Sequence, residues 1–217
     1  KNAPIEDYDF IAFSDQDDVW KPEKLLIAIN ILLKNDYCGY SSSVTATYVS
    51  GKQKYIKKSN SQKLVDYKFE SAGPGCTYVF NVNLGLMMKK CLFNHPIIEK
   101  NFYYHDWLVY YIARNIGFNW YIDKYSYINY RQHNENDTGA NIGLKAWLKR
   151  FQLLKSGWYL DQVYLLEDTL SKSNKLSYIF GSRNGWRFMW LFRFYEARRN
   201  NAHALILGIC ILCRIIK

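Results

Sequence analysis

The sequence lacks the features that would assign its 217 residues to a class directly. It has no internal repeat and no low-complexity linker. Its five cysteines are an odd number without the paired spacing of a zinc site. The one CxxC, "CILC" at 210–213, lies in an apolar run without a second pair or a nearby histidine. We therefore expect buried, reduced thiols rather than a disulfide or zinc framework.

Long apolar runs are also missing. The first ten residues, "KNAPIEDYDF", have neither the apolar region nor the cleavage site of a signal peptide. The apolar run 204–213, "ALILGICILC", would extend ~15 Å as a helix. A bilayer core is ~30 Å thick. This run is long enough to lie in a membrane interface and too short to span it, so we expect a cytoplasmic protein.

Acidic residues are scarce in the last third of the chain. Residues 141–217 carry 13 of the 29 Lys and Arg but only four of the 19 Asp and Glu. This asymmetry favours contact with an anionic surface, although a solvated basic helix face would look the same. Aromatic residues interleave with the basic ones, as in interfacial helices at the inner face of the cell membrane. No RRM or KH signature is present, so nucleic acid is not an expected partner. The aromatic residues are Trp147, Phe151, Trp158, Tyr159, Trp186, Phe188, Trp190, Phe192 and Phe194.

The patterns that are present predict an α/β part over 1–140 and a basic helical part over 141–217. Strands are expected near 8–13, 40–50, 77–81 and 120–130, with a polar hairpin after the second. The first is a nearly continuous apolar run of the kind found in parallel sheets. Residues 21–34 are helix-like, with a predicted apolar face of Leu25, Leu26, Ile29, Leu32 and Leu33. From 142 onward an apolar stripe at helical spacing predicts helices: Leu144, Trp147, Leu148, Phe151 and Leu154.

Three carboxylates, Asp15, Asp17 and Asp18, fall within four positions directly after the first strand. Like charges this close repel unless a cation or donor groups compensate. A helix cap would need only Asp17 or Asp18. An EF-hand loop needs a glycine and a final glutamate that "DQDDVWKPEKLL" lacks. A Mg²⁺ or Mn²⁺ site at the end of a strand, completed by water and substrate phosphates, fits best.

Four sequence blocks follow one another along the chain: "FSDQDDVWKPEKL", "GPGCTYVFN", "YYHDWLVYYIA" and "YRQHNENDTG". Over roughly residues 5–140 the chain resembles bacterial family 2 inverting glycosyltransferases of the GT-A fold, closest to the rhamnosyltransferase-like branch. The resemblance implies a mixed α/β sheet and a set of site residues. Its metal ligands would be Asp15, Asp17 and His133, its catalytic base Asp106, its donor-binding residues Asp18, Arg131 and Gly75, and its acceptor-binding residues His105, Trp107 and Cys76.

The implied chemistry needs such a set. Displacing a nucleoside diphosphate from a sugar builds negative charge on the leaving oxygen, which a divalent cation stabilises. The acceptor hydroxyl needs a carboxylate within hydrogen-bond reach on the opposite face of the ring. Structural alternatives remain: Asp106 as a helix N-cap, His133 as a loop histidine, and Trp107 as a core residue.

One departure from the family pattern concerns the start of the chain. In the resembled fold a nucleotide-binding half precedes the acidic turn, whereas only eight residues precede Asp9 here. We expect a fragment, with a degenerate copy as the alternative, and weak donor binding as supplied. The predicted function is transfer of a sugar from a nucleotide donor to a lipid-linked or oligosaccharide acceptor in cell-surface polysaccharide synthesis. A non-catalytic binding protein and a metal-dependent phosphoester hydrolase are the alternatives.

Overall fold

The computed structural model describes residues 2–132, 151–170 and 194–212, and the chain forms two compact units. Unit 1 consists of residues 1–60, 71–96 and 104–141, and unit 2 of 61–70, 97–103 and 142–217. The division between an α/β part and a helical part at residue 140 stays a prediction. All predicted site residues belong to unit 1.

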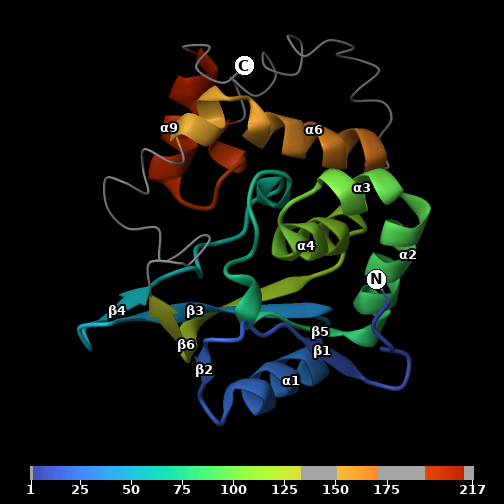
Figure 1. The fold of residues 1–217 in the computed structure, drawn as a ribbon, viewed down its shortest axis with the longest axis vertical. Helices are drawn as coiled ribbons and strands as arrows, with labels where there is room; N and C mark the ends of the chain where they lie inside the picture. Colours follow the sequence, from blue (N-terminus) through green and yellow to red (C-terminus); the bar gives the residue numbers. More distant parts are fainter. Residues whose placement is uncertain (1, 133–150, 171–193, 213–217) are drawn as a thin grey trace. The chain divides into compact units, whose positions relative to one another are not determined.

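Unit 1 is built on a six-stranded mixed sheet in the order β1-β5-β3-β6-β2, with β4 also paired to β3 (Figure 1). The pair β3–β6 is parallel, and the other pairs are antiparallel. The sheet therefore confirms the predicted mixed α/β class. Its strands are β1 (Phe10–Ala12), β2 (Val19–Trp20), β3 (Gly39–Tyr48), β4 (Gln53–Ile56), β5 (Val79–Asn81) and β6 (Trp120–Gln132).

The first strand differs from its prediction. Its apolar run suggested a parallel strand, but within the described residues β1 pairs only with β5, and that pair is antiparallel, with Ile11 opposite Phe80. The parallel pair instead contains β3, whose serines 41–43 are fully buried. A serine can stay buried in a central strand when its hydroxyl is bonded. Ser41 donates to the Ala72 carbonyl, and Ser43 donates to the Asp123 carbonyl.

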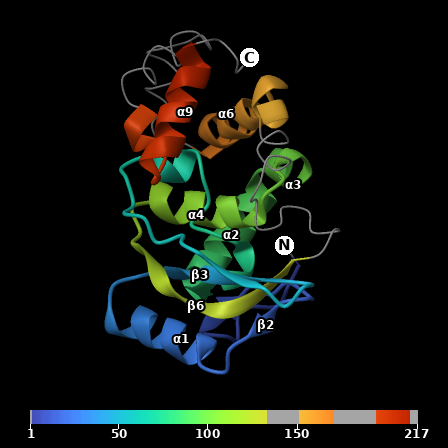
Figure 2. The ribbon, with the colours of Figure 1, turned by 90° about the vertical axis from the view of Figure 1, so that its left-hand side faces the viewer.

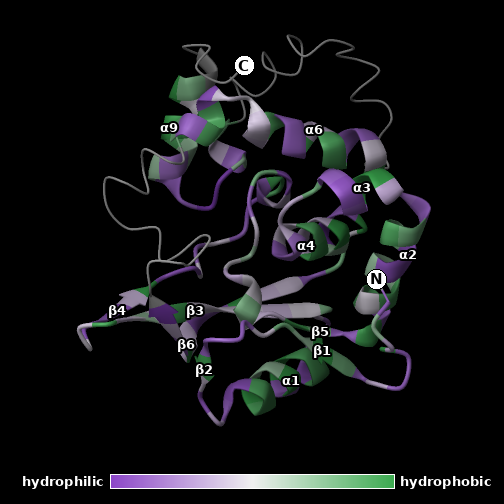
Figure 3. Ribbon diagram, viewed as in Figure 1, coloured by the Kyte–Doolittle hydropathy of each residue, from purple (hydrophilic) through white to green (hydrophobic). Residues whose placement is uncertain are grey.

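Helix α1 (Lys24–Lys34) was predicted correctly in place, and its apolar face was predicted correctly in part. Leu32 is buried and Ile29 packs against the core, as predicted. Leu26 and Leu33, predicted for the same face, are 64% and 70% exposed. Nearly every turn of α1 carries apolar side chains, and Figure 3 colours most of it hydrophobic. Periodicity alone therefore identified only part of the buried face.

Two helices cover the other face of the sheet, as Figures 1 and 2 both show for α4 opposite α1. They are α2 (Val82–Asn94) and α4 (His105–Asn115). Aromatic rings pack α4 onto the sheet: Trp120 lies between Tyr78 and Tyr110, with ring centroids 4.8 and 5.5 Å away. Gly39 makes room for this indole, since a Cβ there would lie 2.2 Å from a Trp120 ring atom. The packing of α4 fixes the position of its first turn, which carries Asp106.

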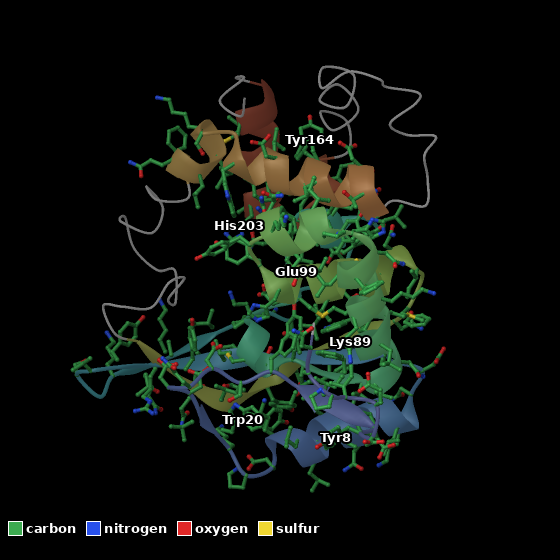
Figure 4. The ribbon with its side chains drawn as sticks, turned by 45° about the vertical axis from the view of Figure 1, so that its right-hand side comes forward. Tyr8, Trp20, Lys89, Glu99, Tyr164 and His203 are labelled. Carbon is green, nitrogen blue, oxygen red and sulfur yellow. The ribbon has the colours of Figure 1, made fainter. Side chains whose placement is uncertain are left out.

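The N-terminal segment is tied to α2 by an ion pair between Glu6 and Lys89, with 2.5 Å between Oε1 and Nζ. Lys89 is labelled on α2 in Figure 4. The hydrogen bond from Lys89 lowers the pKa of Glu6 to about 2. Both side chains are accessible to solvent, so the pair orients the segment more than it stabilises the fold.

Unit 2 contains α3 (Pro96–Asn101, whose first residue belongs to unit 1), α6 (Trp158–Leu170), α9 (Asn201–Leu212) and the short turns η1 (Asp66–Lys68) and η3 (Phe194–Glu196). Ion pairs organise it. The Asp66 carboxylate, fully buried, lies 3.0 Å from the Arg199 guanidinium, and Lys68 lies 2.5 Å from Glu167. Some of the basic charge in the last third of the chain is thus neutralised inside this unit.

The predicted membrane-facing surface falls largely on residues outside the described ranges. Of its aromatic residues, Tyr159 belongs to the core of unit 2: it is 9% exposed and its hydroxyl donates to the Phe69 carbonyl. Lys155 is exposed, as predicted for the basic face. Among residues 2–132, 151–170 and 194–212, no helix combines the length and the apolar character needed to cross a membrane.

Candidate active site

The acidic turn between β1 and β2 converges with the loop before β5. One ligand atom each from Asp15, Asp18 and Cys76 lie within 4.8 Å of one another. Asp15 is exposed, Asp18 is half-buried and Cys76 is fully buried. The group opens to solvent on the Asp15 side. Two carboxylates and a thiol in this arrangement could hold a divalent cation.

Helix capping does not account for the acidic turn. The N-cap position of α1 is Glu23, and no side chain caps the helix there. The cap interpretation for Asp17 or Asp18 is therefore wrong.

Asp17 is placed differently from its neighbours. The converging group does not include it, and its main-chain carbonyl accepts a hydrogen bond from the Arg131 side chain. Arg131 is itself exposed at the end of β6. This bond holds the turn against β6 and brings the predicted donor-binding arginine to the acidic turn. His133, the third predicted metal ligand, lies outside the described residues.

Asp18 is the most electrostatically strained member of the group. Both of its carboxylate oxygens are buried and have no well-formed hydrogen bond within the described part of the chain. Burial raises the pKa of Asp18, and the charges of Asp15 and Asp17 raise it further. The Cys76 thiol and the Arg131 main chain lie near enough to lower this pKa, but they only partly compensate. A buried acceptor of this kind suits a cation.

Lys24 and Trp20 complete the surroundings of the acidic turn, and sequence reasoning did not select either of them. Lys24 is 1% exposed, and its Nζ lies 3.2 Å from the centroid of the Trp20 ring. Nζ has no hydrogen-bond partner among the described residues. Trp20 is labelled in Figure 4. Both residues stand in the block "FSDQDDVWKPEKL", but a lysine in a first helical turn ordinarily faces water, so no sequence signal indicates its burial.

The loop before β5 joins the acidic turn to Asp106. It forms the short turn η2 (Gly75–Thr77). A Cβ on Gly75 would lie 3.0 Å from His105 Nε2 and 3.3 Å from Asp106 Cβ. The next residue, Cys76, faces Asp15 and Asp18. Two adjacent loop residues therefore contact the predicted base on one side and the acidic turn on the other, which explains the need for glycine at 75.

Asp106 lies in the first turn of α4, whose N-cap is Tyr104. The N-cap interpretation of Asp106 is thus wrong. Its Oδ1 accepts a 2.8 Å hydrogen bond from the Trp107 backbone N–H. Loss of solvent raises the pKa of Asp106, although the nearby His105 and the hydrogen bonds from Trp107 and Ser71 oppose the rise. A carboxyl group with a raised pKa is suited to accept a proton near neutral pH.

The three predicted acceptor-binding residues have different environments. His105 is exposed, and its ring packs edge-to-face on Phe13, with centroids 5.1 Å apart. Trp107 is 4% exposed and Cys76 is 0% exposed. Of the three, His105 presents a surface to solvent beside Asp106. Phe13 and Ser71, which contact His105 and Asp106, were not predicted, because only the fold brings them together.

A separate hollow of about 580 Å³ lies at the β2–β6 edge. Its lining consists of Lys21, Tyr55 and Lys124–Tyr127. No predicted site residue contributes to it. We place the candidate site at the acidic turn instead. The ligand atoms of Asp15, Asp18 and Cys76 converge there, and the pKa of Asp18 is raised.

Comparison with known proteins gives one informative match. No protein-family model matches the chain. The dTDP-rhamnosyl transferase RfbG of Shigella flexneri is 36% identical over 215 residues, which cover 99% of this chain and 74% of that protein. The matched region includes the acidic turn, the 74–77 loop and the first turn of α4.

Proposed function

Since the chain belongs to the rhamnosyltransferase-like family 2 glycosyltransferases, the family of RfbG, we propose that it transfers rhamnose from dTDP-rhamnose to a lipid-linked or oligosaccharide acceptor. We propose further that it does so with inversion, on a GT-A fold, at the inner face of the cell membrane. The observation that carries the proposal is the junction at 75–76. There a solvent-open acidic group and the half-buried Asp106 carboxyl group flank one loop.

The acidic turn suits the leaving diphosphate. Asp18 offers two buried oxygens without well-formed hydrogen bonds within the described chain, and Asp15 and Cys76 lie within 4.8 Å of it. These groups fit a divalent cation such as Mg²⁺ or Mn²⁺. In this proposal the ligands of the cation also include Asp15, Asp17 and His133. When bound, such a cation neutralises charge on the departing diphosphate oxygen. Arg131, bonded to the turn and exposed, would add a guanidinium that binds phosphate.

Asp106 would act as the general base. Its carboxylate is oriented by hydrogen bonds from the Trp107 backbone N–H and the Ser71 side chain, and we propose that it accepts the proton of the acceptor hydroxyl. Gly75 lets the sugar approach both groups, because a side chain there would enter the space beside His105 and Asp106. His105 would contact the acceptor from the open side. Removal of the acceptor proton as the hydroxyl attacks opposite the diphosphate inverts the anomeric centre.

Transfer of labelled rhamnose from dTDP-rhamnose into a membrane lipid fraction, with Mn²⁺ or Mg²⁺ supplied, tests this proposal. Asp106→Asn should keep donor binding and reduce transfer by at least about 100-fold, as expected for loss of a general base. Asn101→Asp, a charge change on a different helix, is the matched control and should transfer normally. Free rhamnose released without acceptor would indicate a hydrolase, and neither donor binding nor transfer would indicate a non-catalytic protein; either result contradicts the proposal.

A further inference from the structure

We propose that the Cys76 sulfur is a direct ligand of the cation at the acidic turn, together with Asp15 and Asp18. The site would then favour borderline and soft divalent cations, such as Co²⁺ and Cd²⁺, over Mg²⁺. This inference rests on the proposed function for its biological role, since that function requires a cation at this turn. Its geometry stands independently.

The spacing of the three ligand atoms fits one metal ion. Metal–oxygen and metal–sulfur bonds of about 2.0–2.3 Å place two ligand atoms on opposite sides of an ion about 4.5 Å apart. The atoms of Asp15, Asp18 and Cys76 all lie within 4.8 Å of one another. A single ion could therefore contact all three after small side-chain movements. Thiolate ligands select soft and borderline metals, whereas carboxylates and water suit Mg²⁺.

The sulfur is held rigidly where it is. Cys76 is fully buried in η2. Hydrogen bonds close this turn: the Thr77 N–H and hydroxyl donate to the Pro74 carbonyl at 3.0 and 2.7 Å, and the Tyr78 N–H donates to the Gly75 carbonyl at 2.8 Å. A ligand fixed by its backbone loses little conformational entropy when it binds. The turn thus presents the sulfur to the carboxylates before any ion arrives.

The second observation is the buried charge of Lys24. Its side chain is 1% exposed, its Nζ has no hydrogen-bond partner within the described chain, and it interacts electrostatically with both Asp18 and Cys76. With Asp15 and Asp18 ionised, this group carries one net negative charge. A divalent cation and a thiolate together would make it neutral. Neutral groups of charges are far less costly to bury than groups with a net charge, so Lys24 makes a third anionic ligand acceptable.

Packing alone is the competing account of Cys76. Its side chain belongs to a core cluster with Val44, Ile128 and Tyr130, and a free cysteine commonly acts as a small apolar residue. That account explains the apolar contacts. A hydrogen bond from the Cys76 thiol would explain the contact with Asp18, but neither account explains why the Asp15 carboxylate lies in the same group.

The binding step is balanced without any redox partner. The Cys76 S–H bond breaks, its electron pair forms the sulfur–metal bond, and the proton leaves to solvent. Cation binding should therefore release one more proton in the wild-type chain than in Cys76→Ser.

Titration of the 217-residue chain with Co²⁺ alone tests the assignment, because a thiolate–Co²⁺ bond produces a near-ultraviolet charge-transfer band. We expect the band in the wild-type chain and in Cys38→Ser, and its loss in Cys76→Ser. Cys38 is the matched control, since it is a buried free thiol that donates to the Asn119 carbonyl. Cys76→Ser should weaken Cd²⁺ binding by at least about 10-fold while leaving Mg²⁺ binding little changed.

The outcomes separate this inference from the proposed function. Co²⁺ binding without the band overturns the sulfur ligand and leaves the glycosyltransferase proposal intact. Absence of any cation binding overturns both the sulfur ligand and the metal-dependent part of the proposed function. If Cys76→Ser does not fold, Asp18→Asn provides the test. A charge-transfer band that persists at unchanged Co²⁺ affinity would come from another thiol and would refute the assignment. A weakened band would support it.

Discussion

Replacing Asp18 with asparagine should stabilise the metal-free protein while impairing cation binding. The carboxylate oxygens of Asp18 are buried, without well-formed hydrogen bonds among the described residues, and close to two other acidic side chains. Burial of a charged acceptor without a partner costs more than the ~1–3 kcal/mol typical of a neutral polar group. Asparagine is nearly the same shape and carries no charge, so Asp18→Asn should gain about 1–2 kcal/mol at pH 7. For a chain of this size that is a rise in Tm of about 2–8 °C.

The pH dependence follows from the direction of the pKa shift. Burial raises the folded-state pKa of Asp18 above its unfolded value, so the folded state binds this proton more tightly. The stability that this carboxyl group contributes is present at low pH and is lost as pH rises through the folded pKa. The advantage of Asp18→Asn should therefore be largest at pH 7 and shrink by pH 4, where the unfolded-state carboxyl group, with a pKa of about 3.9, is also about half protonated.

Thermal unfolding with a chelator, at pH 7 and pH 4, measures this effect. Asp7→Asn, an exposed aspartate in the same unit, is the control and should change Tm little. Mn²⁺ at about 100 times its dissociation constant should stabilise the wild type by about 2.7 kcal/mol, and it should stabilise Asp18→Asn much less. A lower Tm for Asp18→Asn at pH 7 in chelator would refute the reasoning, because it would show that Asp18 makes favourable contacts.

Three further changes test neighbouring features. Burial lowers the pKa of Lys24 to about 8, so the free energy of unfolding of the wild type should rise by about 3 kcal/mol between pH 8 and pH 10.5. Urea titrations should show that Lys24→Met abolishes this rise. A rise of the same size in Lys24→Met would contradict the assignment to Lys24. Gly75→Ala should push His105 aside and reduce kcat by about 100-fold with little change in Tm, and normal turnover would show that the loop tolerates a side chain. Arg199→Leu removes the cation 3.0 Å from the buried Asp66 and should destabilise unit 2 by about 3–5 kcal/mol. Arg198→Leu, at the more exposed pair with Glu70, should cost at most about 1 kcal/mol; equal losses would refute the difference in burial.

Sequence patterns predicted where the helices and strands of unit 1 lie better than they predicted how these elements pack and pair. The hairpin after the second strand, the helix after residue 20 and the long strand near 120–130 are all present where composition placed them. The buried face of α1 was predicted only in part, because apolar residues occupy most of its circumference and local periodicity had no means of choosing Ala28 over Leu26. The pairing of β1 was wrong for a similar reason, since an apolar run describes burial and not strand direction.

At the candidate site, too, the sequence identified individual residues but not the contacts that the fold creates between them. The acidic turn could be noticed in the sequence because three carboxylates fall within four positions, whereas Asp106 was selected only through the family resemblance. The role of Lys24 could not be found, since its burial depends on the Trp20 ring and on which side of α1 meets the sheet. Likewise, Cys76 and Asp18 are 58 positions apart in the sequence, and only the sheet, through β5, brings them together.

The cost of this arrangement is itself an argument for a ligand. A folded chain gains little stability from a buried ammonium group without a hydrogen-bond partner and a carboxylate without a well-formed hydrogen bond in the described structure. Asp18 and Lys24 interact electrostatically without forming an ion pair. The ligand atoms of Asp15, Asp18 and Cys76 lie within 4.8 Å of one another, and this group has the charge and the ligand atoms to receive a cation. Groups that cost stability in this way cluster at functional sites. The energetic strain at the acidic turn therefore supports the proposed cation site from physical chemistry alone.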